Sequence, residues 1–241
     1  APTYFILLLA HIPAGIGWGS SGPIGGIHAQ LIERHSGKII SPYYAMGFNI
    51  GIFIGGILAG FILGNTMSPT FVFLILFFLS IVVALIIYMN GLPKDLDFKG
   101  EGEKLKIPEK NVLIFGLLLF VIFGSNGIII DWSALWFTKE LNAPLYLASL
   151  GLICLSCGGI FANLFSNQLI NLFSEKIVGC YFVIFGSLIL FSSIIIGNFY
   201  FILITFFFYG FLTANLVPII IRQAVKHSTE SIPTTVTNLI T

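Results

Sequence analysis

The chain has 241 residues, of which 57% are hydrophobic and 9% are charged, and its formal net charge at pH 7 is +1. Soluble domains carry about 25% charged residues, so the composition excludes a water-soluble globular surface, and the small net charge gives no sign of a nucleic-acid partner. We therefore predict an all-α, polytopic bundle of transmembrane helices.

Seven apolar segments of the length that a spanning helix requires follow one another along the chain. A bilayer-spanning helix needs roughly 20 mainly apolar residues. Apolar residues run continuously rather than alternating with polar ones, which favours helices over the strands of a membrane barrel. The predicted helices cover residues 3–32, 42–64, 69–91, 111–130, 144–165, 177–197 and 199–221.

Lys and Arg residues gather in every second gap between these segments. Ten of the eleven lie in residues 33–41, 92–110, 166–176 and 222–232, and Lys139 is the exception. Basic residues are enriched in the cytoplasmic loops of membrane proteins. These four gaps are therefore predicted to be cytoplasmic, in a multi-pass protein of the cell membrane.

The gap at residues 92–110 divides the chain into two groups of helices, residues 1–91 and 111–241. It holds five Lys and five acidic residues and has no apolar periodicity, so we predict a solvated cytoplasmic linker. The chain begins with Ala, and a further apolar stretch starts after Pro233. We therefore expect it to be a fragment of a longer membrane protein.

Glycines in the second predicted helix form two rows with four-residue spacing. One row is Gly47, Gly51 and Gly55, and the other is Gly56, Gly60 and Gly64. Small residues let helix backbones approach closely, which matters because hydrophobic burial does not drive helix association in lipid. The rows predict tight contacts with neighbouring helices.

Asp131 stands at the outer end of the fourth predicted helix, and ionisable groups at membrane depth are costly. Asn126 and Ser133 are seven residues apart and share a face if the helix continues. One interpretation is a solute or proton contact near the outer mouth. The other is an interfacial acid beside an aromatic belt formed by Trp132 and Trp136.

Polar residues also cluster at the inner end of the first predicted helix. Glu33 and Arg34 are candidates for a cytoplasmic gate pair, or else they are ordinary polar residues at the water boundary. Amide side chains within the helices are expected to bond across helices; they are Asn49, Asn163, Gln168 and Asn215.

Cys154 and Cys157 have the spacing of a redox or zinc motif but lack a second ligand pair. We interpret them as small packing residues. The sequence therefore predicts no metal site, no cofactor and no catalytic residue, and the chain is not expected to be an enzyme.

Short loops, a charged cytoplasmic linker between two helix groups and glycine-rich helices together resemble the major facilitator superfamily. Those proteins have twelve helices in two six-helix halves, each made of two three-helix repeats. Residues 1–91 then correspond to helices four to six, and residues 111–241 to helices seven to ten and the start of eleven. Residues 130–136 resemble an acid-Trp-Ser run in a bacterial branch related to sugar permeases, and residues 29–37 resemble its four-to-five junction.

The resemblance implies a secondary transporter that moves a small polar solute across the bilayer by alternating access. Helices one, four, seven and ten line the cavity in that family, which points to five solute contacts in this chain: Trp18, Asn126, Asp131, Trp132 and Asn215. Asp131 is the candidate for proton coupling. The aromatic and amide content suits a neutral solute such as a sugar.

Two motifs of the family are incomplete in this sequence. Residues 167–176 correspond to its basic loop motif, and they keep only Glu175 and Lys176 of that motif's charges. Residues 51–56 resemble the helix-five motif of drug antiporters but lack its proline, so antiport is not supported.

Seven helices that start outside and end inside would also suit a membrane receptor or sensor, and a structural membrane subunit is a third interpretation. Further apolar segments upstream and downstream in the reading frame would favour the transporter.

Overall fold

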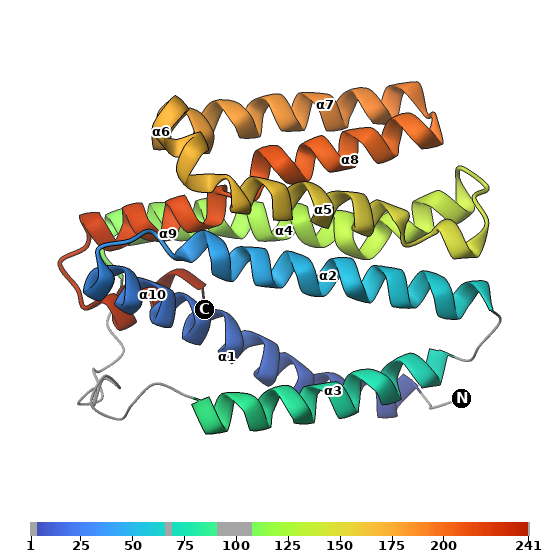
Figure 1. Cartoon of the computed structure of the whole chain (residues 1–241), viewed down its shortest axis with the longest axis horizontal. Helices are drawn as coiled ribbons and strands as arrows, with labels where there is room; N and C mark the ends of the chain where they lie inside the picture. The colour runs from blue at the N-terminus through green and yellow to red at the C-terminus, as the bar shows by residue number, and fades with distance from the viewer. Residues whose placement is uncertain (1–3, 66–68, 91–107, 241) are drawn as a thin grey trace.

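The computed structural model describes residues 4–65, 69–90 and 108–240, and within these ranges it contains helices and no strand (Figure 1). The α-helices are α1 (Tyr4–Ser36), α2 (Ser41–Gly64), α3 (Pro69–Asn90), α4 (Lys110–Lys139), α5 (Leu150–Leu164), α6 (Ser166–Lys176), α7 (Phe182–Ile196), α8 (Phe199–Thr213), α9 (Leu216–His227) and α10 (Ile232–Ile240). A 3₁₀ turn, η1 (Leu145–Leu147), precedes α5, and a π-helical turn, η2 (Ile177–Tyr181), precedes α7.

Six helical segments of the described chain are long and apolar enough to cross a membrane, and the apolar run Phe73–Met89 within α3 is a shorter addition. Continuous apolar runs form helices here because a helix satisfies all its backbone hydrogen bonds internally, as lipid requires. The predicted all-α, multi-pass bundle is confirmed.

Three predicted boundaries are wrong. The fourth predicted helix does not end at residue 130 but continues as α4 to Lys139, so Asp131 lies within it. The gap at residues 166–176 forms α6, which is kinked at Ser174, where φ is 67° and ψ is 155°. The last predicted helix is divided into α8 and α9, because Pro218 has no N–H group to bond the carbonyl of Ala214. Most of the predicted linker lies outside the described residues.

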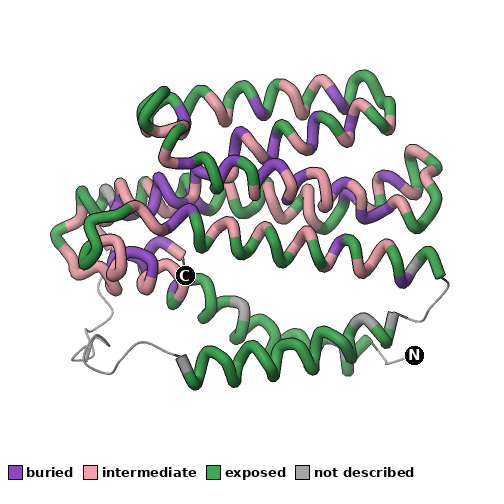
Figure 2. Tube along the Cα trace, viewed as in Figure 1, coloured by how far each residue is buried: buried purple, intermediate pink, exposed green. Residues whose placement is uncertain are grey.

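The helices form a layered bundle in which the two predicted groups touch along α2. This helix packs against α5, α5 packs against α8, and α7 covers α8 (Figure 1). A separate apolar core is shared by α4, α9 and α10 and includes Leu119, Ile220 and Val236. Every described side chain of α3 is exposed (Figure 2), so this helix lies at the periphery.

The two glycine rows of α2 have different surroundings. In the second row, a Cβ atom on Gly60 would lie 2.7 Å from the Ser149 hydroxyl, and one on Gly56 would lie 2.9 Å from Ile153. In the first row, no described atom lies within 4 Å of a Cβ built on any of its three glycines. The second row is therefore confirmed as a close contact with η1 and α5, and the first row faces away from the described helices.

Two glycines mark a close approach between α5 and α8. A Cβ atom on Gly158 would lie 2.0 Å from the carbonyl oxygen of Phe207, and one on Gly210 would lie 2.0 Å from that of Leu155. Both distances are far inside van der Waals contact, so only glycine fits at either position. The α5–α8 pair is thus held backbone to backbone.

Candidate functional site

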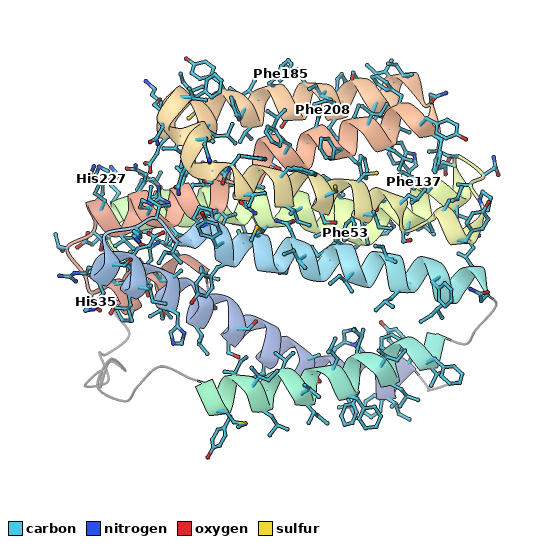
Figure 3. The ribbon with its side chains drawn as sticks, viewed as in Figure 1. His35, Phe53, Phe137, Phe185, Phe208 and His227 are labelled. Atoms are coloured by element: carbon cyan, nitrogen blue, oxygen red, sulfur yellow. The ribbon has the colours of Figure 1, made fainter. Side chains whose placement is uncertain are left out.

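A cluster of charged and polar side chains lies at the end of the bundle where α1 and α9 finish. Figure 3 places His35, near the end of α1, and His227, at the end of α9, on this same side. We call it the basic end, because Arg34, Lys38 and Arg222 belong to it. Its central members are Glu33, Glu175, Arg222 and Gln223, which we call the ion-pair cluster.

Glu33 sits at the turn that joins α1 to α2. Gly37 follows α1 with a φ angle of +65°, the left-handed conformation that glycine adopts without strain. This turn brings the start of α2 back beside Glu33, whose Oε1 atom accepts hydrogen bonds from the backbone N–H groups of Ile40 at 2.7 Å and Ser41 at 2.6 Å. A carboxylate is favourable there because the N-terminus of a helix carries partial positive charge.

The second oxygen of Glu33 faces the other group of helices. The Nε atom of Arg222, in α9, lies 3.7 Å from Oε2 of Glu33. A second nitrogen of Arg222, Nη1, donates to Oε1 of Glu175 in α6, and the amide of Gln223 donates to Oε2 of the same carboxylate. One cation therefore lies between two carboxylates that come from different helix groups.

All three charged side chains of the cluster are partly buried, with 11% of Glu33, 18% of Arg222 and 26% of Glu175 exposed. Ion pairs screened from solvent interact more strongly than those on an open surface. Removing one member would leave the opposite charge uncompensated in a poorly hydrated place. The cluster is thus a specific contact between the two groups.

The predicted gate pair of Glu33 and Arg34 takes a different form in the structure. The cation that faces Glu33 is Arg222, whereas Arg34 is exposed. Arg34 instead lines a cavity of about 480 Å³ that also touches Gln30, Glu33, Ser228 and Glu230. In the sequence, Arg222 counts only as one of the basic residues that predict a cytoplasmic gap. None of its neighbours in the chain indicates a partner in α1.

The predicted solute contacts that the structure describes differ in their exposure. In α4, Asn126 is half-buried, Asp131 is exposed, and Trp132 is 62% exposed. Asn215 is 2% exposed, and its amide Nδ2 donates to the backbone carbonyl of Ala162 at 3.0 Å. The side chain of Trp18 lies outside what the structure describes.

The fourth helix does continue past residue 130, as the shared face of Asn126 and Ser133 requires. Ser133 is buried, and its hydroxyl has no hydrogen-bond partner among the described residues. Asp131 and Trp132, by contrast, lie on the exposed side of α4. The two polar faces of this helix are therefore separate.

Comparison with known proteins gives a family and one relative. The model of the Major Facilitator Superfamily matches residues 1–241. An uncharacterised MFS-type transporter of Yersinia pestis is 24% identical over 208 residues, which make up 82% of this chain and 51% of the relative. The chain thus spans about half the length of that curated relative, and no solved structure matches it significantly.

The predicted resemblance is confirmed by these findings. A match over the whole chain agrees with the strand-free described bundle and with its six candidate membrane-spanning segments. The chain belongs to the major facilitator superfamily, and its described part carries six helical segments that are long and apolar enough to cross a membrane.

Proposed function

We propose that this chain is the middle part of a secondary transporter that moves a small polar solute across the cell membrane by alternating access. In this proposal, residues 1–91 complete one half of the transporter, residues 92–110 form the cytoplasmic linker, and residues 111–241 begin the other half. The observation that carries the proposal is the ion pair between Glu33 and Arg222, which joins the two halves at the basic end.

The ion-pair cluster acts as the cytoplasmic gate in this proposal. Glu33 and Arg222 hold the halves together at the basic end, which the positive-inside rule assigns to the cytoplasm. A solute can leave on that side only after the Arg222–Glu33 contact breaks. Glu175 keeps Arg222 paired when this happens, because its carboxylate is bonded to both Arg222 and Gln223.

The solute site in this proposal lies between α1, α4 and the α8–α9 helix. Trp18, Asn126, Asp131, Trp132 and Asn215 remain its candidate contacts. Amide and aromatic groups suit a neutral solute with several hydroxyl groups, such as a sugar. Asp131 is the candidate group for proton symport, since it is the one acid in the membrane-spanning part of α4.

Uptake by the full-length protein in sealed vesicles tests this proposal. We expect solute accumulation that depends on an inward proton gradient, and we expect Asp131→Asn to abolish that dependence while leaving counterflow of solute intact. Glu140→Gln, a change to an exposed acid just after the same helix, is the matched control. Absence of flux with every candidate solute would contradict transport, and proton dependence retained in Asp131→Asn would remove that residue from coupling.

A further inference from the structure

Two helices of the bundle break beside each other. The first break lies between α5 and α6, where Phe165 has a ψ angle of 14°. The second lies between α8 and α9, where Asn215 has a ψ angle of −6° and Pro218 supplies no N–H group for the carbonyl of Ala214. The amide of Asn215 donates to the carbonyl of Ala162 at 3.0 Å, so the two breaks are in direct contact.

Buried polar side chains gather at these paired breaks. Asn163 lies at the end of α5, and Ser166 and Asn167 open α6, so the three residues flank the break at Phe165. Asn163 is 1% exposed, and Ser166 and Asn215 are each 2% exposed. Five of their buried polar atoms have no hydrogen-bond partner among the described residues: Nδ2 and Oδ1 of Asn163, Oγ of Ser166, Oδ1 of Asn167 and Oδ1 of Asn215.

Two other buried serines satisfy their hydroxyl groups locally, whereas the hydroxyls of Ser133 and Ser149 have no partner among the described residues. Ser156 in α5 donates to the carbonyl of Leu152 at 2.7 Å, and Ser193 in α7 donates to that of Leu190 at 2.6 Å. Both are fully buried. Ser166 makes no such bond within the described chain, so its hydroxyl is left for another partner. Buried polar groups in proteins are almost always paired, with protein or with ordered water.

We propose that the paired breaks bind ordered water. Water suits the site because it both donates and accepts: the cluster offers the amide N–H group of Asn163 together with oxygens from Asn163, Ser166, Asn167 and Asn215. A buried water needs two to four polar partners, and this turn supplies them. No acidic side chain belongs to the cluster, which favours a neutral ligand over a cation.

A cavity that shares Asn167 with the site lies at the surface of the bundle. Asn167 and Asn171, one turn apart in α6, line a cavity of about 380 Å³ together with Lys38, Ile40 and Tyr43. This cavity lies at the basic end, between α6 and the start of α2. Asn167 therefore borders the cavity and also presents a buried oxygen to the cluster.

Bound water would complete the hydrogen bonds that the breaks leave open. Membrane helices tolerate interruptions because side chains and ordered waters satisfy the freed backbone groups. When water binds the polar groups at a break, the helix can bend there without breaking a hydrogen bond between two protein groups. This inference goes beyond the proposed function and holds whichever solute the protein carries.

A density map of the full-length protein that resolves ordered water is the direct test. We expect density within hydrogen-bonding distance of Asn163 and of at least one of Ser166, Asn167 and Asn215. Continuous protein–protein hydrogen bonds among these side chains, or an empty cluster, would overturn the proposal.

Thermal unfolding of two serine variants gives an independent test. Ser166→Ala and Ser156→Ala remove the same hydroxyl group on the two sides of the α5–α6 break, but only the Ser156 hydroxyl is bonded to its own helix. If water binds Ser166, Ser166→Ala should unfold at a lower temperature than Ser156→Ala. If the hydroxyl is buried dry, its removal relieves a desolvated group, and Ser166→Ala should unfold at the higher temperature, which would refute the proposal.

The same unfolding assay separates water from a cation. Midpoints measured in sodium, potassium and choline chloride at equal ionic strength should agree for the wild type. A midpoint raised by one metal ion, and not raised in Asn163→Leu, would assign a cation to the site and overturn the inference. None of these measurements depends on transport, so their outcome is distinguishable from failure of the proposed function.

Discussion

The Nε atom of Arg222 lies 3.7 Å from the Oε2 atom of Glu33, so an ion pair joins the last turn of α1 to α9. The two residues belong to helix groups on opposite sides of the charged segment at residues 92–110. They are brought together because α2 packs along α5 and α1 approaches α10.

Neutralising Arg222 should destabilise the protein. Arg222→Gln leaves two partly buried carboxylates without their cation, and we expect a loss of about 2 kcal/mol, less than for a fully buried pair because all three side chains are partly exposed. Thermal unfolding in detergent measures the change. Lys226→Gln, an exposed position in the same helix, is the control, and equal midpoints for the two variants would contradict the assigned role.

A covalent cross-link between positions 33 and 222 should stop transport. Glu33→Cys and Arg222→Cys, in a background without the three native cysteines, can be joined by a short cleavable thiol cross-linker. We expect uptake to be lost on cross-linking and restored on cleavage, because the halves can no longer separate. The single variant Arg222→Cys receives the same treatment as a control. Undiminished uptake by fully cross-linked protein would rule out a gate at this position.

Any side chain at Gly158 should disrupt the α5–α8 contact. Gly158→Ala places a Cβ atom 2.0 Å from a backbone oxygen, and overpacking of this kind costs about 1–3 kcal/mol or more. Gly116→Ala in α4, where no described atom lies within 4 Å of the added Cβ, should be neutral or slightly stabilising. The unfolding midpoints of the two variants are compared. Equal unfolding midpoints for the two variants would contradict a close contact between α5 and α8 at this position.

Removing the amide of Asn215 should loosen the α5–α9 contact. Asn215→Ala loses the bond to the Ala162 carbonyl, and interhelical hydrogen bonds in membranes contribute about 0.6 to 1.7 kcal/mol. Asn171→Ala, an exposed amide in α6, controls for loss of an asparagine. Stability and solute affinity are measured together. A change in affinity without a change in stability would favour solute contact over interhelical bonding.

The sequence predicted the helical class and the course of five of the seven helical segments well, because continuous apolar runs and alternating basic gaps are local signals. It did not predict the break at Asn215, although Pro218 was visible, since a proline can bend a membrane helix without dividing it. Nor did it predict which glycine row of α2 would pack. Both rows have the same spacing, and only the position of α5 distinguishes Gly60 from Gly51.

The candidate site was predicted less completely. Glu33 was identified from its place at the end of an apolar segment, and Glu175 from a shortened family motif. Their common partner, Arg222, was not identified, because the pairing depends on how distant helices pack. A carboxylate such as Glu33 predicts that its partner is a cation, but it does not predict where in the chain that cation lies. Ion pairs between distant helices therefore cannot be predicted from the residue pattern of a single sequence.

The two oxygens of Glu33 have different contacts, and ionic strength should affect them differently. Oε1 bonds two backbone N–H groups at 2.6 and 2.7 Å, contacts too short for dissolved ions to screen. Oε2 faces Arg222 across the longer distance of 3.7 Å, between side chains that are 11% and 18% exposed, so added salt weakens this attraction more than it weakens the short hydrogen bonds. Raising the salt concentration should therefore loosen the contact between the helix groups while the turn from α1 to α2 stays intact.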